Sequence, residues 1–548
     1  MYQKYCALFF FLAFAHSLQA TVVFVNHDAT GANDGASWAD AFTDLQDALG
    51  TAQSGDTIWV AEGVYRPTSS TDRYISFEIP SGVALYGGFA GTENSLASRD
   101  WLANPTILSG DIGTLMDSLD NSYRVIRLAN VNNTTLDGFT VTAGYNNNPV
   151  PSLTGRSGAG MHLSNARCSL YNMTFVGNTA RFGGAIGLWS NSELVAENCL
   201  FQQNTSNGSN DRCGGAILAE DEFLNCSYLN CRFVRNRVLY VGGAGGAVCG
   251  GENTFINCVF SNNSASFGSA IASSNASIYQ SSFGGNQDNF GLLSNGNYQA
   301  FNSIFWLNIN STTLYESVAT LSACLLKEGQ CPNGASCEDA TMIYNKDPYF
   351  VDPRNGDFSL SLCSPAIDAG ANANIPAFLM EDVTGISRVI NGVVDMGAYE
   401  FLDLEPQYRP TDVRNTNGNF ASRSLAGAII CANAHPGPDT IRFVLPGIAP
   451  HLIYPTYALP ALTDEGSVID ASDFPLGDIR LDGSQLVPTF PTQVFSGLAF
   501  QGTGIEVYGM DIRNFSEAGI SLSVSSNAAR IGAAGKGNVL WNNQYENI

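Results

Sequence analysis

The stretch "FVGNTARFGGAIGL", residues 175–188, joins an F-x-x-N motif to G-G-A and an aliphatic residue. A related stretch, "FQQNTSNGSNDRCGGAIL", covers residues 201–218. The F-x-x-N motif occurs six times, with phenylalanines 26, 32, 27, 23 and 22 residues apart. A period in this range is typical of a solenoid, in which each repeat packs on its neighbours. The six pairs are Phe175/Asn178, Phe201/Asn204, Phe233/Asn236, Phe260/Asn263, Phe283/Asn286 and Phe305/Asn308.

The repeat length fits one coil of three short strands and three turns, at ~3.3 Å per strand residue. Coils stacked at about 4.8 Å pair each strand in parallel with its equivalent, so equivalent residues lie above one another. We expect the phenylalanines to form an apolar column and asparagines to occupy left-handed bends that hydrogen-bond the next coil. Gly-Gly pairs at 183–184, 214–215 and 245–246 would turn the backbone sharply. The pattern predicts an all-β, right-handed parallel β-helix.

The first open edge of a solenoid needs a cover, because an unpaired edge templates aggregation. "DGASWADAFTDLQDALG", residues 34–50, predicts a capping helix for this purpose. Ser37 and Asp40 have the spacing of a capping box, and Gly50 would end the helix. The first strand and turn follow in "GDTIWVAEGVY", residues 55–65.

The N-terminus indicates export. Residues 1–20 combine one lysine, a short apolar run and a small residue at position 20, which is typical of a secretory signal peptide. The apolar run is too short to cross a bilayer, and no later stretch is apolar enough to do so. We therefore expect a secreted protein, extracellular or on the outer cell surface, with no integral membrane span.

The net charge limits the classes of partner that the protein is expected to bind. The net charge of −24 disfavours nucleic-acid binding, because an acidic surface repels phosphates.

Of 13 cysteines, 12 follow the predicted cleavage site. The cysteines that directly follow the first asparagine of a repeat are predicted to be buried side chains that fill the core. The best disulfide candidates cluster near the end of the repeats, without a nearby histidine that would suggest zinc. They are Cys324, Cys331, Cys337 and Cys363.

These motifs resemble known exported proteins. The F-x-x-N and G-G-A-[ILV] pairs resemble the repeats of polymorphic outer-membrane proteins, which are β-helical surface adhesins. "DPYFVDPRNGDFSLSLCSPAIDAGAN" (347–372) and "DVTGISRVINGVVDMGAYEF" (382–401) are similar to the choice-of-anchor Q module, which closes such helices. The resemblance covers residues 21–402, with the closing module at about 341–402. It implies a pectate-lyase-like solenoid of an exported, adhesin-like protein.

A second domain is predicted after a linker at residues 403–410. Residues 411–548 again suggest a capping helix and first strands, and "ARIGAAGKGNVLWNNQYENI" (529–548) resembles the coils of another β-helix family. The sequence stops within this pattern, which leads us to expect a truncated second β-helix and a longer parent protein.

Candidate chemistry is sparse. No residue qualifies as catalytic, and the N-T-D, G-H-G and R-I-K motifs of galacturonidases are absent from the sequence. No organic cofactor is expected. Calcium is the one candidate metal, because carboxylates gather in two loops. One loop holds Asp28 and Asp34, and the other holds Glu220, Asp221 and Glu222. Arg235 and Arg237 could face the second loop and place acid beside base.

Three functions remain open from the sequence. The leading interpretation is a non-catalytic, adhesin-like protein that binds extracellular polysaccharides or cell-surface glycans or proteins. The first alternative is a polysaccharide lyase or another pectate-lyase-like carbohydrate-active enzyme, with carboxylates and a basic residue on one face. The second is a structural spacer for a missing C-terminal module.

Overall fold

The computed structural model divides the chain into two compact units, Met1–Asn345 with Asn374–Pro376, and Lys346–Ala373 with Ala377–Ile548. Residues 1–19 of the predicted signal peptide and the predicted linker at residues 403–410 lie outside the described residues. The described residues are 20–149, 152, 154–208, 214–221, 223–287, 290–309, 312–337, 341–361, 364–390, 392–402, 425–434, 438–443, 449–455, 458–487 and 493–544.

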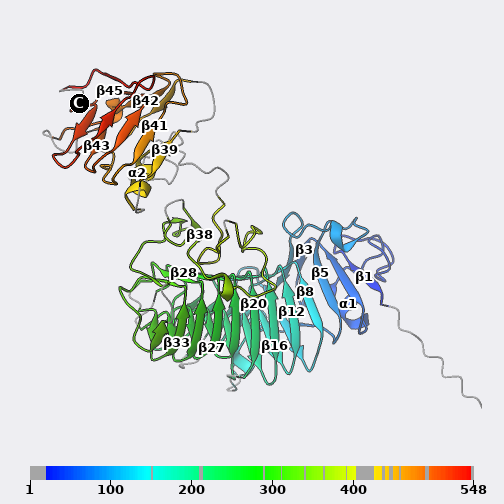
Figure 1. Ribbon diagram of the computed structural model, residues 1–548. Coiled ribbons are helices and arrows are strands. Elements are labelled where there is room, and N and C mark those ends of the chain that lie inside the picture. The colour runs from blue at the N-terminus through cyan, green and yellow to red at the C-terminus, as the bar shows by residue number, and fades with distance from the viewer. Residues whose placement is uncertain are drawn as a thin grey trace, which may run out of the picture. The chain divides into compact units, whose positions relative to one another are not determined.

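The first unit is a right-handed parallel β-helix, as the repeat predicts, with strands stacked coil on coil (Figure 1). Three long sheets form its sides, and the strand pairs described within them are all parallel. The first sheet runs β1 (Val22–Val25), β2 (Thr57–Ala61), β5 (Ala84–Phe89), β8 (Thr134–Asp137), β12 (Arg167–Tyr171), β16 (Glu193–Glu197), β20 (Asn225–Leu229), β24 (Glu252–Ile256), β27 (Asn275–Tyr279), β30 (Asn297–Phe301), β33 (Val318–Ser322), β35 (Ala335–Cys337).

The other sheets complete each coil. The second sheet runs β3 (Gly63–Tyr65), β6 (Thr106–Ser109), β9 (Phe139–Thr142), β13 (Thr174–Val176), β17 (Leu200–Gln202), β21 (Arg232–Val234), β25 (Val259–Ser261), β28 (Ser282–Gly284), β31 (Ile304–Trp306), β34 (Leu325–Leu326), β36 (Ile343–Tyr344). The third runs β4 (Phe77–Glu78), β7 (Ile126–Ala129), β11 (Met161–Ser164), β15 (Ile186–Trp189), β19 (Ile217–Ala219), β23 (Val248–Cys249), β26 (Ile271–Ala272), β29 (Leu293–Ser294), β32 (Leu314–Tyr315). A fourth, short sheet holds β10 (Tyr145–Asn146), β14 (Thr179–Ala180), β18 (Thr205–Ser206), β22 (Arg237–Val238).

The phenylalanines of the six repeats form one buried column in the second sheet. Successive ring centroids lie 5.4, 4.9, 4.8, 4.5 and 4.8 Å apart, with the planes within 18° of parallel. Each ring is at most 1 % exposed. Burying a phenylalanine stabilises a fold by roughly 1.5–3 kcal/mol, so the column is a major part of the core.

The asparagines of the F-x-x-N motif form a buried hydrogen-bonded ladder. The side-chain oxygen of Asn236 accepts from the backbone N–H of Asn204 at 3.1 Å and from its amide group at 3.0 Å. The Asn236 amide donates to Phe201 O at 2.8 Å and to Asn263 Oδ1 at 3.0 Å. The same pattern continues from Asn178 to Asn308. Each asparagine thus joins three successive coils.

The left-handed bends belong to a different set of residues, those that precede each phenylalanine by three positions. Their φ angles lie between +42° and +55°, at Asn172, Asn198, Asn230, Asn257, Gln280 and Asn302. Asparagine tolerates this conformation better than other residues with a Cβ, which explains its recurrence there. The F-x-x-N asparagines themselves have no positive φ.

The Gly-Gly pairs lie where coils approach most closely. Gly183 has a φ of +58°, and a Cβ there would lie 2.2 Å from Ile186 O. At Gly215, a Cβ would lie 2.1 Å from Gly246 O in the next coil. Any other residue at Gly215 would clash with backbone, so glycine is required there by space, whereas at Gly183 the positive φ requires it as well.

The capping helix is shorter than the sequence predicts. Helix α1 spans Leu45–Thr51, and Asp44 is its N-cap, accepting from Gln46 N at 2.9 Å. The prediction of a capping box at Ser37 and Asp40 is therefore wrong, and Gly50 does not end the helix. Ser37 and Asp40 do hydrogen-bond each other, but within a turn, because Asp40 also accepts from Ala32 N at 2.9 Å and holds the preceding loop.

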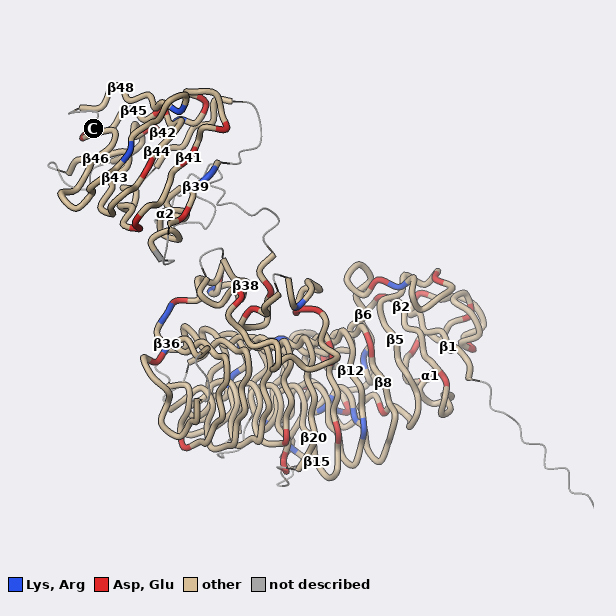
Figure 2. The backbone as a smooth tube through the Cα atoms, in the orientation of Figure 1, with Lys and Arg blue, Asp and Glu red and all other residues tan. Residues whose placement is uncertain are grey.

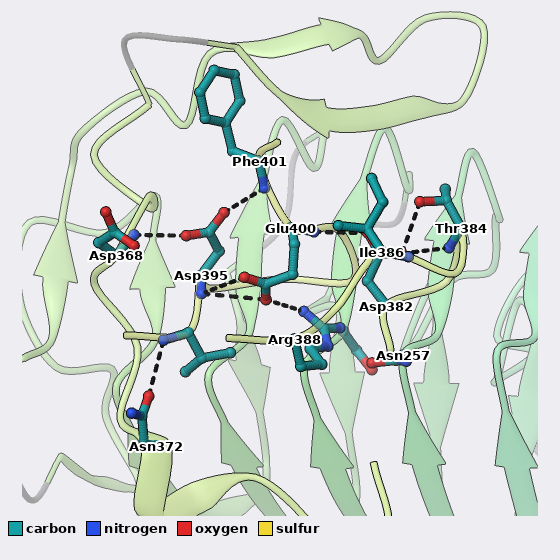
Figure 3. Close-up of polar contacts among 12 residues, drawn as sticks. Asn257, Asp368, Asn372, Asp382, Thr384, Ile386, Arg388, Asp395, Glu400 and Phe401 are labelled. Carbon is teal, nitrogen blue, oxygen red and sulfur yellow. Dashed lines mark hydrogen bonds and ion pairs between the residues drawn. The ribbon is translucent and has the colours of Figure 1, made fainter. Parts of the chain in front are cut away.

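In the second unit, the residues that resemble a closing module contain one antiparallel pair, β37 (Phe350–Asp352) and β38 (Asp357–Leu360). Arg388 donates to Glu400 at 2.7 Å, and both side chains are 1 % exposed (Figure 3). Asp395 accepts from the N–H groups of Asp368 and Phe401, both at 2.6 Å, while Asp382 accepts from Glu400 N at 2.8 Å. With little regular structure here, this buried network organises the segment.

The C-terminal residues of the second unit form parallel sheets of stacked short strands. Helix α2 spans Leu425–Ala434, and the strand pairs among the described residues that follow it are all parallel. The sheets are β39 (Thr440–Arg442), β41 (Val468–Asp470), β44 (Glu506–Tyr508), β47 (Arg530–Ile531); β40 (His451–Ile453), β42 (Ile479–Asp482), β45 (Met510–Arg513), β48 (Val539–Trp541); and β43 (Leu498–Phe500), β46 (Ile520–Leu522).

Removing one member of the asparagine ladder should destabilise the first unit strongly. Asn236→Ala leaves the buried N–H of Asn204 and the carbonyl of Phe201 without their partners. Unsatisfied buried groups cost ~1–3 kcal/mol each, so we expect a loss of about 2–4 kcal/mol in the free energy of unfolding. Urea denaturation followed by circular dichroism measures it. Asn225→Ala, at an exposed position, is the control, and equal losses in both variants would contradict the ladder's role.

The buried carboxyls should make the segment around Arg388 less stable as pH rises. Desolvation raises the pKa of Asp395 to about 6, and that of Glu400 to about 8 despite the adjacent guanidinium. A carboxyl with a raised folded pKa binds its proton more tightly when folded, so its stabilisation is present at about pH 4 and is lost by about pH 8.

Hydrogen exchange of peptides 346–402, corrected for intrinsic rates, tests this trend. Protection should fall from acidic to alkaline pH, and Glu400→Gln should flatten the slope. Glu381→Gln, at an exposed position, is the matched control and should leave the slope unchanged. Protection that rises with pH would show that pairing with Arg388 outweighs desolvation.

Candidate groove on the first sheet

Outward side chains of the first sheet form straight rows along the solenoid, because equivalent strand residues are in register. One row runs Glu252, Asn275, Asn297, Val318. The next outward row runs Thr254, Ser277, Gln299, Thr320, Ser336. Buried residues alternate with these, and the rows are polar apart from Val318 and run parallel to the solenoid axis.

The turns that border these rows on one side differ in length. Five residues, 220–224, connect β19 to β20, whereas two, Gly250 and Gly251, connect β23 to β24. Gly250 has a φ of +77°, and a Cβ there would lie 2.0 Å from Ala219 O. This turn is therefore pressed against the preceding coil, and the longer turn stands above it.

Two hollows lie beside each other here and share two lining residues. The first, of about 540 Å³, is lined by the turns from Leu218–Asp221 to Asn295–Asn297. The second, of about 640 Å³, lies over β24, β27, β30, β33 and β35. Asn275 and Asn297 line both hollows. Five strands at ~4.8 Å spacing give a length of about 19 Å. We call the two hollows together the sheet groove.

The groove floor is held by short polar contacts. Asn297 donates to Asn275 Oδ1 at 2.9 Å, which fixes the row between neighbouring strands. Asn253 donates to Gly250 O at 2.8 Å and to Ser274 Oγ at 2.6 Å. Its own Oδ1 has no hydrogen-bond partner among the described residues, although the side chain is buried. This acceptor lies on the inward face of β24, beneath the outward rows.

The charge around the groove has one sign. The described lining residues include three carboxylates, Glu220, Asp221 and Glu252, and no Lys, Arg or His. The sequence has no Lys or Arg between Arg237 and Lys327. Figure 2 shows acidic residues beside β20 and largely uncharged coils beyond it towards β36.

The sequence-predicted calcium residues lie in two separate places. Asp28 follows β1, and its Oδ1 lies 3.3 Å from Nε2 of His27. Asp34 accepts a hydrogen bond from Ala36 N at 3.0 Å within the loop that Asp40 holds. Hydrogen bonds from Ala32 and Ser37 lower the pKa of Asp40. Glu220 and Asp221 line the groove, and Glu222 lies outside the described residues. No group of three or more potential metal ligands occurs among the described residues.

The arginines proposed to face the acidic turn lie at another corner of the coil. Arg235 follows β21 of the second sheet, and Arg237 is in β22 of the fourth, where it donates to Thr205 Oγ1 at 3.2 Å. Glu220 lies between the third and first sheets. The coil therefore does not bring this acid and these bases together.

The sequence reasoning missed the groove residues Asn253, Asn275 and Asn297. Their spacing carries no F-x-x-N signal, and only strand register shows that Asn275 and Asn297 share the outward face, whereas Asn253 pairs with Ala276 on the inward face. The one available signal was the long segment without Lys or Arg, which marks an unusual surface.

The disulfide prediction is confirmed for Cys331 and Cys337 and is wrong for Cys324. Cys331 and Cys337 form a disulfide in the last coil, whereas Cys324 is a buried thiol and Cys363 lies outside the described residues. The thiols that follow the repeat asparagines are buried, and desolvation raises the pKa of Cys258 to about 12 and that of Cys231 well above its usual value. Such thiols form no nucleophile at neutral pH.

Comparisons with known proteins give weak likenesses. No family model matches the chain, and no curated protein matches it. Among solved structures, pectate lyase Pel9A shares 15 % identity over 70 % of this chain and 97 % of its own, with a TM-score of 0.36. A rhamnogalacturonan lyase shares 12 % over 56 % and 68 %, with a TM-score of 0.28. The alginate lyase AlyGC shares 12 % over 93 % and 78 %, with a TM-score of 0.26. At these values the likenesses carry no information on activity. Among the described residues, no helix is long and apolar enough to span a membrane.

The buried thiols should resist alkylation in the folded protein. We expect iodoacetamide to leave Cys231 and Cys258 unmodified under native conditions and to modify both in urea, as read by mass spectrometry of peptides. After mild reduction, Cys331 and Cys337 should react first, since both are partly exposed. Rapid native labelling of Cys231 would show that its coil opens.

Proposed function

We propose that this protein is an exported, adhesin-like β-helix protein that binds glycan chains in the sheet groove without cleaving them. The observation that carries the proposal is the pair of adjoining hollows along the first sheet, about 19 Å long at ~4.8 Å per strand and lined by stacked amide and hydroxyl side chains. Regularly spaced hydrogen-bonding groups suit a chain of repeating hydroxyl-bearing units, and strand register keeps them in line.

The composition of the groove favours binding over lyase chemistry. A lyase needs a base near the abstracted proton and a cation to stabilise the developing charge. The described lining residues offer no Lys, Arg or His, and Tyr298 donates to Ser294 O while remaining buried. The predicted signal peptide and the resemblance to polymorphic outer-membrane proteins and the choice-of-anchor Q module support an extracellular or cell-surface setting.

A glycan array followed by calorimetry on the hits tests the proposal. We expect the full chain to bind at least one polysaccharide, and Asn275→Ala combined with Asn297→Ala to weaken binding about tenfold, since each lost hydrogen bond contributes ~0.5–1.5 kcal/mol. Gln202→Ala, on the second sheet and outside the groove, is the control.

Two results would contradict the proposal. One is that no glycan binds, or that the double variant binds as tightly as the native chain. The other is the release of new chain ends from a bound polysaccharide, with or without calcium, which would favour the lyase alternative.

A further inference from the structure

We infer that the outer face of the third sheet binds a tetrahedral oxyanion, a sulfate or phosphate group that is either free or esterified to a glycan. The site lies on β7 and β11 and the segments beside them, whereas the sheet groove lies over β24 to β35 of the first sheet. The inference therefore goes beyond the proposed function and does not depend on it. It rests on three basic side chains, those of Arg124, Arg127 and His162.

Strand register places Arg127 and His162 side by side. His162 in β11 pairs with Arg127 in β7 on one side and with Gly187 in β15 on the other. The neighbours of His162 along the strand, Met161 and Leu163, belong to the core, so alternation turns the imidazole to the outer face. The histidine is nevertheless only 5 % exposed. It is therefore an outward group that other parts of the chain shield.

Ser157 shields the imidazole and connects it to Arg124. Gly187 leaves room for this serine, since a Cβ on Gly187 would lie 2.7 Å from Ser157 Oγ. Ser157 Oγ accepts from Trp189 Nε1 at 2.6 Å and lies 3.3 Å from His162 Nδ1. The carbonyl of the same serine accepts from Arg124 Nε at 3.4 Å. Arg124 and His162, which come from neighbouring coils, are thus held at one residue.

Each of the three basic side chains keeps hydrogen-bonding capacity for a ligand. Arg124 donates through Nε and Nη2 to two backbone carbonyls, which leaves Nη1. Arg127 donates through Nη1 to Glu78, which leaves Nε and Nη2. His162 is engaged through Nδ1, and its Nε2 makes no hydrogen bond among the described residues. Donors from three side chains are therefore available at the same place.

The positive charge at this place is incompletely balanced. Among the described residues, Glu78 is the one carboxylate paired with these side chains, at 2.7 Å from Arg127, and it is 65 % exposed. Burial and the neighbouring Arg127 lower the pKa of Arg124 to about 10. Burial and both guanidinium groups lower the pKa of His162 to about 3. An anion bound here would oppose both pKa shifts, because it favours the charged form of each base.

The arrangement of the donors favours a tetrahedral oxyanion over a carboxylate. The donors come from a residue that precedes β7, from β7 itself and from β11. A phosphate or sulfate ester offers three acceptor oxygens in different directions, whereas a carboxylate offers two in one plane. Guanidinium groups bind such oxyanions through charge-assisted hydrogen bonds.

Isothermal calorimetry of the full chain tests the inference with sulfate, phosphate and acetate, each titrated at constant ionic strength in chloride. We expect sulfate and phosphate to bind at one site and acetate to give no saturable heat. A sulfated galactose oligomer and its desulfated form then distinguish the two sources of the oxyanion. Tighter binding of the sulfated oligomer than of free sulfate indicates an ester on a glycan, and tighter binding of free sulfate indicates the ion.

Two substitutions should change the affinity for sulfate in opposite directions. Arg127→Gln should weaken binding about tenfold, because a charge-assisted donor is lost. Glu78→Gln should strengthen binding about threefold, because the carboxylate that competes for Arg127 is removed. The matched control is the exposed pair Arg167 and Glu193, which joins adjacent coils of the first sheet at 3.0 Å. Arg167→Gln and Glu193→Gln should leave the affinity unchanged.

Three results would overturn the inference. One is that neither sulfate nor phosphate shows saturable binding, and another is that acetate binds as tightly as sulfate. The third is an equal effect of Arg127→Gln and Arg167→Gln, since sulfate would then respond to the overall charge of the protein and not to a local site. None of these results bears on the sheet groove, which the glycan array tests by itself.

Discussion

The register between coils is the constraint on which the rest of the first unit depends, and the asparagine ladder fixes it. Each ladder asparagine satisfies backbone groups of one neighbouring coil and side-chain groups of both. A shift by one residue would break these bonds and would also move the phenylalanine rings from the core to the surface. The ladder and the ring column therefore enforce the same alignment from two kinds of interaction.

Because the interior fixes the register between coils, surface residues at equivalent strand positions are aligned as well. Residues such as Asn275 and Asn297 make few contacts of their own, yet they lie in straight rows because the buried residues beside them are aligned. The coils can then vary in their turns without losing the sheet. The turn that carries Glu220 and Asp221 is an example, because it is longer than the turn of Gly250 and Gly251 in the next coil.

The two units use buried polar groups in different ways. In the first unit the ladder repeats one neutral motif, so its contribution grows with the number of coils. In the second unit, Arg388, Glu400 and Asp395 form a single ionisable network inside a segment with little regular structure. A neutral ladder is insensitive to pH, whereas the ionisable network couples folding to protonation.

The sequence by itself determined the parallel β-helix and the residues of its core, since Phe175, Asn178 and their equivalents recur at the length of one coil. Local patterns were less decisive: Ser37 and Asp40 have capping-box spacing, but the helix begins at Leu45 because Asp40 is engaged by the preceding loop. The tertiary structure alone decided the groove. Glu220, Asn275 and Asn297 are far apart in sequence and share no motif, and stacking of coils at ~4.8 Å is what brings them to one face.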